Sequence, residues 1–173
     1  GSAAPCIQTL QQAGSQQLSC PRKIEVIEKP LWVREGESHL VILPYDGFKV
    51  SYTLDYNHPA VGTQFFEFDN NKDSFVKEIA PARTFGFQKE LKALHKKGLA
   101  LGGNLNNAVL IGEESIVNSL RYPDELVRHK ILDIIGDMAL NGFIKGHIIG
   151  VKSGHSLHVK LAQKIFQNIN SGE

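Results

Sequence analysis

The fold is organised around one stretch in the last third of the chain, HKILDIIGD, at residues 129–137. A helix turns by about 100° per residue, so residues four positions apart lie above one another on the same side. His129, Asp133 and Asp137 therefore form a polar stripe, and Glu125 precedes it. The apolar residues that lie on roughly the opposite side are Val127, Ile131, Ile134, Ile135 and Met138. This apolar side is predicted to face the core.

The polar stripe points away from the predicted core, so it is either a solvated surface or a surface that another domain covers. Leu126, Gly136 and Leu140 lie among its polar residues. A solvated helix face more often carries Lys, Glu or Gln at such positions, which favours a covered surface. His129 and Asp133, one turn apart, can both reach one ion, and they form an ordinary ligand pair for zinc. The spacing by itself is common in helices and does not establish a site.

The composition indicates one globular domain without the features of several other protein classes. The chain has 173 residues, of which 42% are hydrophobic, and this is enough for one core. A formal net charge of +1 without any block of like charges is not the footprint of a nucleic-acid-binding protein. No apolar run approaches the roughly 20 residues that a membrane span needs, and a secretory signal is not expected. Cys6 and Cys20 are not part of a C-x-x-C pair and are interpreted as free thiols of a cytoplasmic protein, with a disulfide between them as the open alternative.

Hydrophobic periodicity and turn residues predict an α+β fold. Helices are expected over residues 3–13, 75–79, 88–97, the stretch from Pro123 to Gly142, and from His155 onward. Strands are expected over residues 23–28, 31–33, 39–43, 48–56, 63–68, 108–111 and 144–151, and residues 83–87 are expected to be a short piece that is either extended or turning. The closely spaced strands before residue 57 favour an antiparallel meander. These elements together predict a two-layer sandwich, with a mostly antiparallel sheet and helices packed on one face.

A catalytic zinc needs about three protein ligands, so residues outside the central helix are required. His155 follows Gly154 at a strand-to-helix turn, where side chains often project into a site. Asp137 is placed either to orient a histidine such as His155 or to face water. The Thr84 hydroxyl either polarises a carbonyl or bonds to the backbone of its own strand. His158, on the final helix, is interpreted as a solvated residue.

Several short motifs occur together in one order and at one spacing. They are GSAAP (1–5), Phe48 with DYNHP (55–59), ARTFGF (82–87), GLALGG (98–103), LRY (120–122), DELVRHKILD (124–133), GD (136–137) and KSGH (152–155). This series resembles the zinc-dependent UDP-3-O-acyl-N-acetylglucosamine deacetylases of lipid A and lipopolysaccharide synthesis in Gram-negative bacteria. The resemblance covers essentially the whole chain.

The resemblance implies two similar α/β layers that face each other, with zinc and substrate between them. Residues 1–20 would then be a connecting helix and linker that follow a missing N-terminal domain, and residues 21–173 would be the C-terminal α+β domain. In that family the Gly-Ser-Ala-Ala-Pro stretch lies inside the protein, so Gly1 is expected to be the cut edge of a longer chain.

The resemblance also implies a role for each matching residue. His129 and Asp133 would be two ligands of a Zn²⁺ cofactor. His155 would be the cationic general acid, Asp137 would orient it, and Thr84 would bond to the oxyanion. Residues implied to line the substrate site are Lys130, Phe85, Phe87, Leu91 and Gly103, with the segment from Leu91 to Ala108 lining a passage for the acyl chain.

The family's third zinc ligand, a histidine, and its general base, a glutamate, belong to the first layer and have no counterpart in this sequence. The hypothesis is therefore an amide hydrolase that is incomplete without an N-terminal half, either in the same protein or as a separate chain. Two alternatives stay open. One is a non-catalytic α+β binding module, and the other is a different metallohydrolase with His58 as its third ligand.

Overall fold

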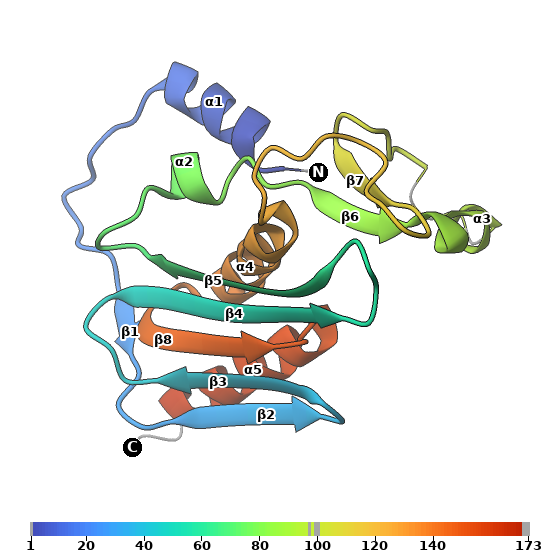
Figure 1. Cartoon of the computed structure of the whole chain (residues 1–173). Helices are drawn as coiled ribbons and strands as arrows, with labels where there is room; N and C mark the ends of the chain where they lie inside the picture. Colours follow the sequence, from blue (N-terminus) through green and yellow to red (C-terminus); the bar gives the residue numbers. More distant parts are fainter. Residues whose placement is uncertain (1, 97, 99–100, 171–173) are drawn as a thin grey trace.

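The computed structural model describes residues 2–96, 98 and 101–170 and shows an α+β sandwich (Figure 1). Its strands are β1 (Ile24–Val26), β2 (Leu31–Glu35), β3 (Ser38–Leu43), β4 (Phe48–Tyr56), β5 (Gly62–Asp69), β6 (Thr84–Phe87), β7 (Ala108–Ile111) and β8 (Phe143–Val151). Its helices are α1 (Ala4–Ala13), α2 (Phe75–Glu78), α3 (Gln88–Lys96), α4 (Glu125–Met138), the 3-10 turn η1 (Ala139–Asn141) and α5 (His155–Asn170). Every predicted helix and strand is present, and Lys97, predicted to end α3, lies outside the described residues.

The sheet confirms the predicted fold class but corrects the predicted meander. Its strand order is β2-β3-β8-β4-β5, with β1 paired to β8 at one end. The pair β2–β3 is antiparallel, as predicted, and β4–β5 is antiparallel as well, but β8 lies between β3 and β4 and runs parallel to β4. The prediction placed β4 beside β3 because they are neighbours in sequence. A long-range pairing of β8 with both strands overrides that local signal.

Two glycines of β8 let it fit at the centre of the sheet. A Cβ atom on Gly146 would lie 2.8 Å from the Ile42 side chain, and one on Gly150 would lie 2.7 Å from the Tyr52 ring. Such separations are too short for real side chains. The neighbouring strands β3 and β4 can therefore extend large buried side chains across β8.

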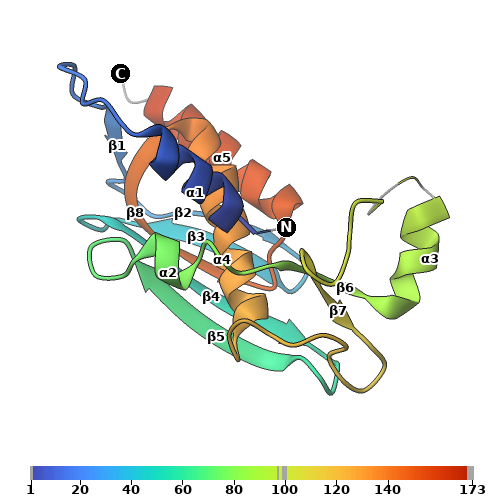
Figure 2. The same ribbon diagram turned by 90° about the horizontal axis from the view of Figure 1, so that it is seen from above.

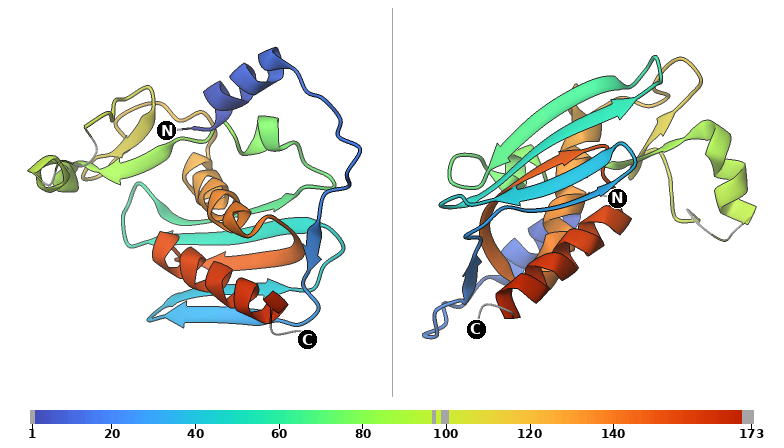
Figure 3. Two further views of the ribbon diagram at one scale, coloured as in Figure 1. Left: turned by 180° about the vertical axis from the view of Figure 1, so that it is seen from behind. Right: turned by 90° about the horizontal axis from the view of Figure 1, so that it is seen from below.

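The helices α4 and α5 lie side by side on one face of this sheet and enclose the core (Figures 2 and 3). The predicted core side of α4 is largely confirmed, because Val127, Ile131, Ile134 and Met138 are fully buried. Leu126 differs from the prediction, since it is also fully buried although it was placed among the polar residues. A parallel pair formed by β6 and β7 carries α3 away from the main layers (Figure 3).

The N-terminal segment lies at the edge of the domain near α2 and has little core of its own (Figure 1). The helix α1 ends at Gly14, whose φ of +78° fits the predicted C-terminal cap. None of its residues is buried. The backbone amides of Ala3 and Ala4 donate to the carbonyl of Ala80, which attaches this segment to the domain. Among the described residues, no helix combines the length and the hydrophobicity that crossing a membrane requires.

A buried ion pair holds the start of α4 against the segment that leads into β6. The Glu125 carboxylate, which is 0% exposed, accepts bonds from the Arg83 side chain at 2.8 and 2.9 Å and from the Arg83 backbone amide at 2.9 Å. It also accepts from the Arg121 amide at 2.7 Å. The prediction that Glu125 precedes the outward-facing stripe as part of the same surface is therefore wrong, because its side chain is buried. Burial alone raises the pKa of Glu125, but the bonds from Arg83 and Arg121 outweigh it and hold this pKa below its ordinary value.

We expect Glu125→Gln to lower the free energy of unfolding by about 3–5 kcal/mol, because it leaves the Arg83 guanidinium buried without its counter-ion. Urea unfolding at neutral pH measures this loss. The matched control is Glu114→Gln, an exposed residue, which should change stability by less than about 0.5 kcal/mol.

The ion pair between Arg83 and Glu125 also makes the free energy of unfolding depend on pH, and the direction of this dependence can be derived. The pKa of Glu125 is lower in the folded state than in the unfolded chain, so the stabilisation is present above the unfolded pKa. It is lost as the pH falls through the folded pKa. The wild-type chain should therefore lose more stability on acidification than Glu125→Gln. Equal stability of the two proteins at neutral pH would contradict this account.

Candidate functional site

A surface hollow brings together five of the predicted site residues. Thr84 from β6, His155 from α5, and His129, Asp133 and Asp137 from α4 all line it. The remaining lining residues are Ser2, Ala3, Leu132 and Gly136. The polar stripe of α4 is thus the floor of an open hollow and lies outside the apolar interior. It is less exposed than a solvated face would be, because His129 is only 7% exposed.

The hydrogen bonds of His129 determine which of its ring nitrogens faces the hollow's carboxylate. Its Nδ1 lies 3.1 Å from the carbonyl oxygen of Ala82. A carbonyl only accepts, so Nδ1 carries a proton and donates it there. In a neutral ring, Nε2 then carries a lone pair, and it lies 3.2 Å from Oδ1 of Asp133. Two acceptor atoms at this separation need a proton or a cation between them. A backbone bond to the far nitrogen is also the usual way in which a metal-binding histidine is oriented.

A second group of possible metal ligands consists of Asp137, His155 and His158, whose ligand atoms all lie within 4.8 Å of one another. Interatomic distances distinguish this group from the pair formed by His129 and Asp133. Two tetrahedral zinc ligands, each about 2.0–2.1 Å from the ion, lie roughly 3.3 Å apart. The separation of 3.2 Å between His129 and Asp133 fits this value. Both histidines of the second group lie 2.7 Å from Asp137 Oδ2, which is the length of a charge-assisted hydrogen bond. We therefore assign the second group to hydrogen bonding.

Asp133 is the ionised partner in the candidate metal pair. Its Oδ2 accepts from the Lys130 ammonium at 3.1 Å. Burial raises the pKa of Asp133, but its bond to His129 and the nearby Lys130 charge outweigh burial and lower this pKa to about 2. The carboxylate is therefore available as an anionic ligand at any physiological pH. The Lys130 ammonium also lies 5.5 Å from the centre of the Phe85 ring, which places both predicted substrate residues beside the hollow.

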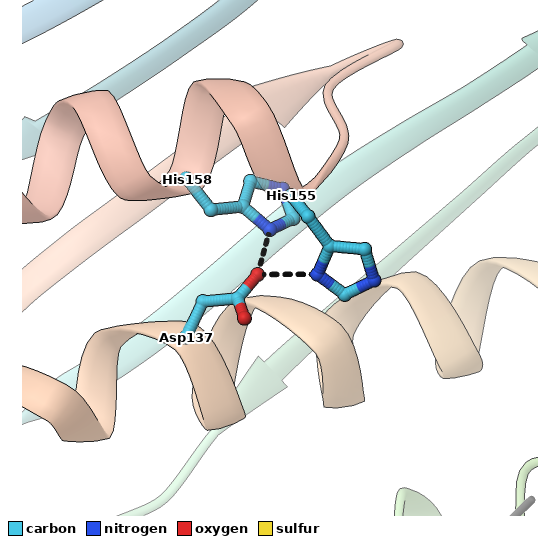
Figure 4. Close-up of side chains that lie close together, drawn as sticks. All are labelled: Asp137, His155 and His158. Carbon is cyan, nitrogen blue, oxygen red and sulfur yellow. Dashed lines mark hydrogen bonds and ion pairs between the residues drawn. The ribbon is translucent and has the colours of Figure 1, made fainter.

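Asp137 joins two histidines of α5 through one of its oxygens (Figure 4). His155 begins α5 and its side chain is 67% exposed, whereas His158 one turn further is 0% exposed. The interpretation of His158 as solvated is wrong. It shares a buried stripe with Leu161 and Ile165, and this helical spacing was the signal in the sequence that would have placed it inside. The Nε2 of His155 lies 3.9 Å from Asp133 Oδ2, next to the candidate metal pair.

Other predicted residues lie outside the hollow. Phe87 packs against Tyr56 and His58, with ring centres 5.4 and 5.3 Å apart. Leu91 is half-buried on α3 and Gly103 lies in an exposed loop, and neither lines the hollow. The proposed acyl passage from Leu91 to Ala108 includes residues 97 and 99–100, which lie outside the described residues. His58 Nδ1 accepts from the Ala60 amide at 3.2 Å and also lies outside the hollow, so its proposed ligand role has no geometric support here.

We expect His129→Ala to weaken zinc binding by the chain by at least roughly tenfold, because it removes one of two ligands. Competition with a chromophoric zinc chelator measures the affinity. His39→Ala removes an exposed histidine of β3 and should leave the affinity unchanged. His58→Ala should also have no effect. A loss of zinc binding in His58→Ala, with His129→Ala unaffected, would instead support the alternative ligand set.

Comparison with known proteins agrees with this geometry. The sequence profile of the UDP-3-O-acyl N-acetylglycosamine deacetylase family matches residues 1–167. The UDP-3-O-acyl-N-acetylglucosamine deacetylase of Geotalea uraniireducens is 45% identical over 168 residues, covering 95% of this chain and 55% of that protein. The deacetylases of Syntrophotalea carbinolica and Acidithiobacillus ferrooxidans are 42% and 43% identical, over 100% and 95% of this chain and 59% and 56% of their own lengths.

The chain thus spans a little over half the length of the curated relatives it matches. The matched region includes every residue that lines the hollow. The chain belongs to the UDP-3-O-acyl N-acetylglycosamine deacetylase family.

Proposed function

We propose that this chain supplies the C-terminal half of the active site of a zinc-dependent amide hydrolase. The reaction would remove the N-acetyl group from UDP-3-O-acyl-N-acetylglucosamine in the cytoplasm, as a step of lipid A biosynthesis in a Gram-negative bacterium. Residues 1–20 would be the connection to an N-terminal half and residues 21–173 the C-terminal domain. The observation that carries the proposal is the pair of acceptor atoms on His129 and Asp133, 3.2 Å apart in an open hollow.

The residues of the hollow fit a zinc site with an open position. A neutral imidazole and an ionised carboxylate are ligands that zinc accepts, and a histidine in the set argues against magnesium or calcium. When bound there, zinc would polarise the acetamide carbonyl and lower the pKa of a bound water molecule. His129 and Asp133 would hold the ion, and the Ala82 carbonyl would keep the His129 ring in the required orientation.

The other side chains of the hollow have complementary tasks in amide hydrolysis. His155 donates through Nδ1 to Asp137, so its Nε2 is left to face the substrate. A protonated Nε2 would give its proton to the departing nitrogen, which leaves as a neutral amine. The Thr84 hydroxyl would donate a hydrogen bond to the oxyanion that forms on the carbonyl oxygen. Lys130 and Phe85 would hold the sugar end of the substrate beside the hollow.

The hollow alone is chemically incomplete. Among the described residues that line it, there is no glutamate to take a proton from water, and its remaining metal-ligand types, Asp137 and His155, are hydrogen-bonded to each other. Removing a general base costs about 10²–10⁴ in rate. We propose that a histidine and a glutamate from the N-terminal half supply the third metal ligand and the general base. The length that this chain's relatives have beyond the matched region supports that proposal.

We expect this chain, mixed with a polypeptide that carries the relatives' N-terminal half, to release acetate from UDP-3-O-acyl-N-acetylglucosamine, and neither part to do so alone. Asp133→Ala should lower the rate by more than about 100-fold, because it removes a zinc ligand. The matched control is Asp46→Ala, which removes a carboxylate from the exposed turn between β3 and β4. Two folded, zinc-loaded halves that form a complex without any hydrolysis would favour the non-catalytic binding module.

A further inference from the structure

His158 is a fully buried titratable residue beside the hollow that the proposed reaction does not use. Both of its ring nitrogens have partners. Nδ1 lies 2.7 Å from Asp137 Oδ2 (Figure 4), and Nε2 lies 3.0 Å from the hydroxyl of Ser153. A buried imidazole with two specific partners holds one orientation, because any rotation would leave polar atoms without bonds.

The contacts of Ser153 attach this histidine to the core of the domain. Ser153 is itself buried, and its carbonyl accepts a bond from the Tyr52 hydroxyl at 2.5 Å. Tyr52 lies in the centre of the sheet, where its ring occupies the space that a side chain on Gly150 would need. A continuous series of contacts therefore runs from the sheet through Ser153 and His158 to Asp137.

The donors along this series can be assigned from the chemistry of each group. Burial lowers the pKa of His158, so the neutral ring with one N–H is favoured. The Asp137 carboxylate only accepts, so the N–H must be at Nδ1. The Ser153 hydroxyl then donates to Nε2. The same carboxylate oxygen also accepts from Nδ1 of His155, 2.7 Å away. One oxygen atom is thus held between two imidazole donors.

The two histidines differ in what fixes them. The His155 side chain is mostly exposed, and its bond to Asp137 determines which nitrogen carries its proton. That bond is useful only if the carboxylate keeps one rotamer. The buried His158 fixes the rotamer of the Asp137 carboxylate, and that carboxylate in turn fixes the tautomer of His155. The two rings also meet edge to face, with centroids 5.9 Å apart, so the test must separate the loss of the buried donor from the loss of ring volume.

We propose that His158 is a positioning residue, whose Nδ1–H fixes the Asp137 carboxylate and thereby gives His155 a single tautomer with Nε2 toward the hollow. The positioning itself is a property of this chain's geometry. Its meaning for catalysis rests on the proposed function.

Two substitutions separate the hydrogen bond from the volume of the ring. The side-chain amide of asparagine lies near the place of a histidine Nδ1, so His158→Asn retains a donor toward Asp137. His158→Leu fills a similar space without any donor. Leu161→Ala, one turn along the same buried face of α5, is the matched control, because it weakens packing and leaves the polar series intact.

The test is long-range ¹H–¹⁵N correlation on the zinc-free chain with ¹⁵N-labelled histidine, at about pH 8.5, where ordinary imidazoles are neutral. The wild type, His158→Asn and Leu161→Ala should each show His155 as the single Nδ1–H tautomer. His158→Leu should show a mixture of the two tautomers. The proposal is overturned if His155 keeps one tautomer in His158→Leu, or if Leu161→Ala loses it as well.

Kinetics in the complex of both halves distinguish this proposal from the proposed function. His158→Leu should lower kcat roughly tenfold with KM within about twofold, and His158→Asn should restore kcat. A fall in kcat without the change of tautomer would overturn the positioning role. The expected tautomers together with a wild-type complex that hydrolyses nothing would support the positioning role and reject the proposed function.

Discussion

The fold holds the Nε2 atom of His129 and the Oδ1 atom of Asp133 3.2 Å apart with little access to water, and when the imidazole is neutral both atoms are acceptors. Lone pairs at this distance repel one another unless a proton or a cation lies between them. Because the Ala82 carbonyl takes the Nδ1 proton, Nε2 is the ring nitrogen at which a second proton or a metal cation bridges the pair. The zinc chemistry, the need for further ligands and the openness of the hollow all follow from this pair.

The buried ion pair between Arg83 and Glu125, at the start of α4, helps to hold the His129–Asp133 pair in place. Glu125 binds both the side chain and the backbone amide of Arg83, and it thereby fixes the segment that precedes β6. Ala82, the residue before Arg83, supplies the carbonyl that orients His129, and Thr84, the residue after it, lines the hollow. One buried carboxylate thus sets the relative position of α4 and β6, the two elements that carry most of the site.

Helical periodicity was enough to predict the pairing of His129 with Asp133, because that contact lies within one turn of one helix. It did not predict that Glu125 is buried, since a buried charge depends on Arg83, far away in the sequence. Periodicity also did not predict that β8 lies between β3 and β4, because those pairings join residues far apart in the sequence. His158 was misinterpreted although its spacing matched the buried face of α5, because a histidine on a final helix is more often solvated. The carboxylate that joins it to His155 comes from another helix.

Anomalous diffraction from a zinc-soaked crystal of the chain is the most direct test of this account. A single strong zinc peak should lie about 2.0–2.2 Å from both His129 Nε2 and a carboxylate oxygen of Asp133. The Asp137 oxygen should remain hydrogen-bonded to both histidines of α5. A peak bound instead by Asp137, His155 and His158, with His129 and Asp133 free of metal, would contradict the central claim.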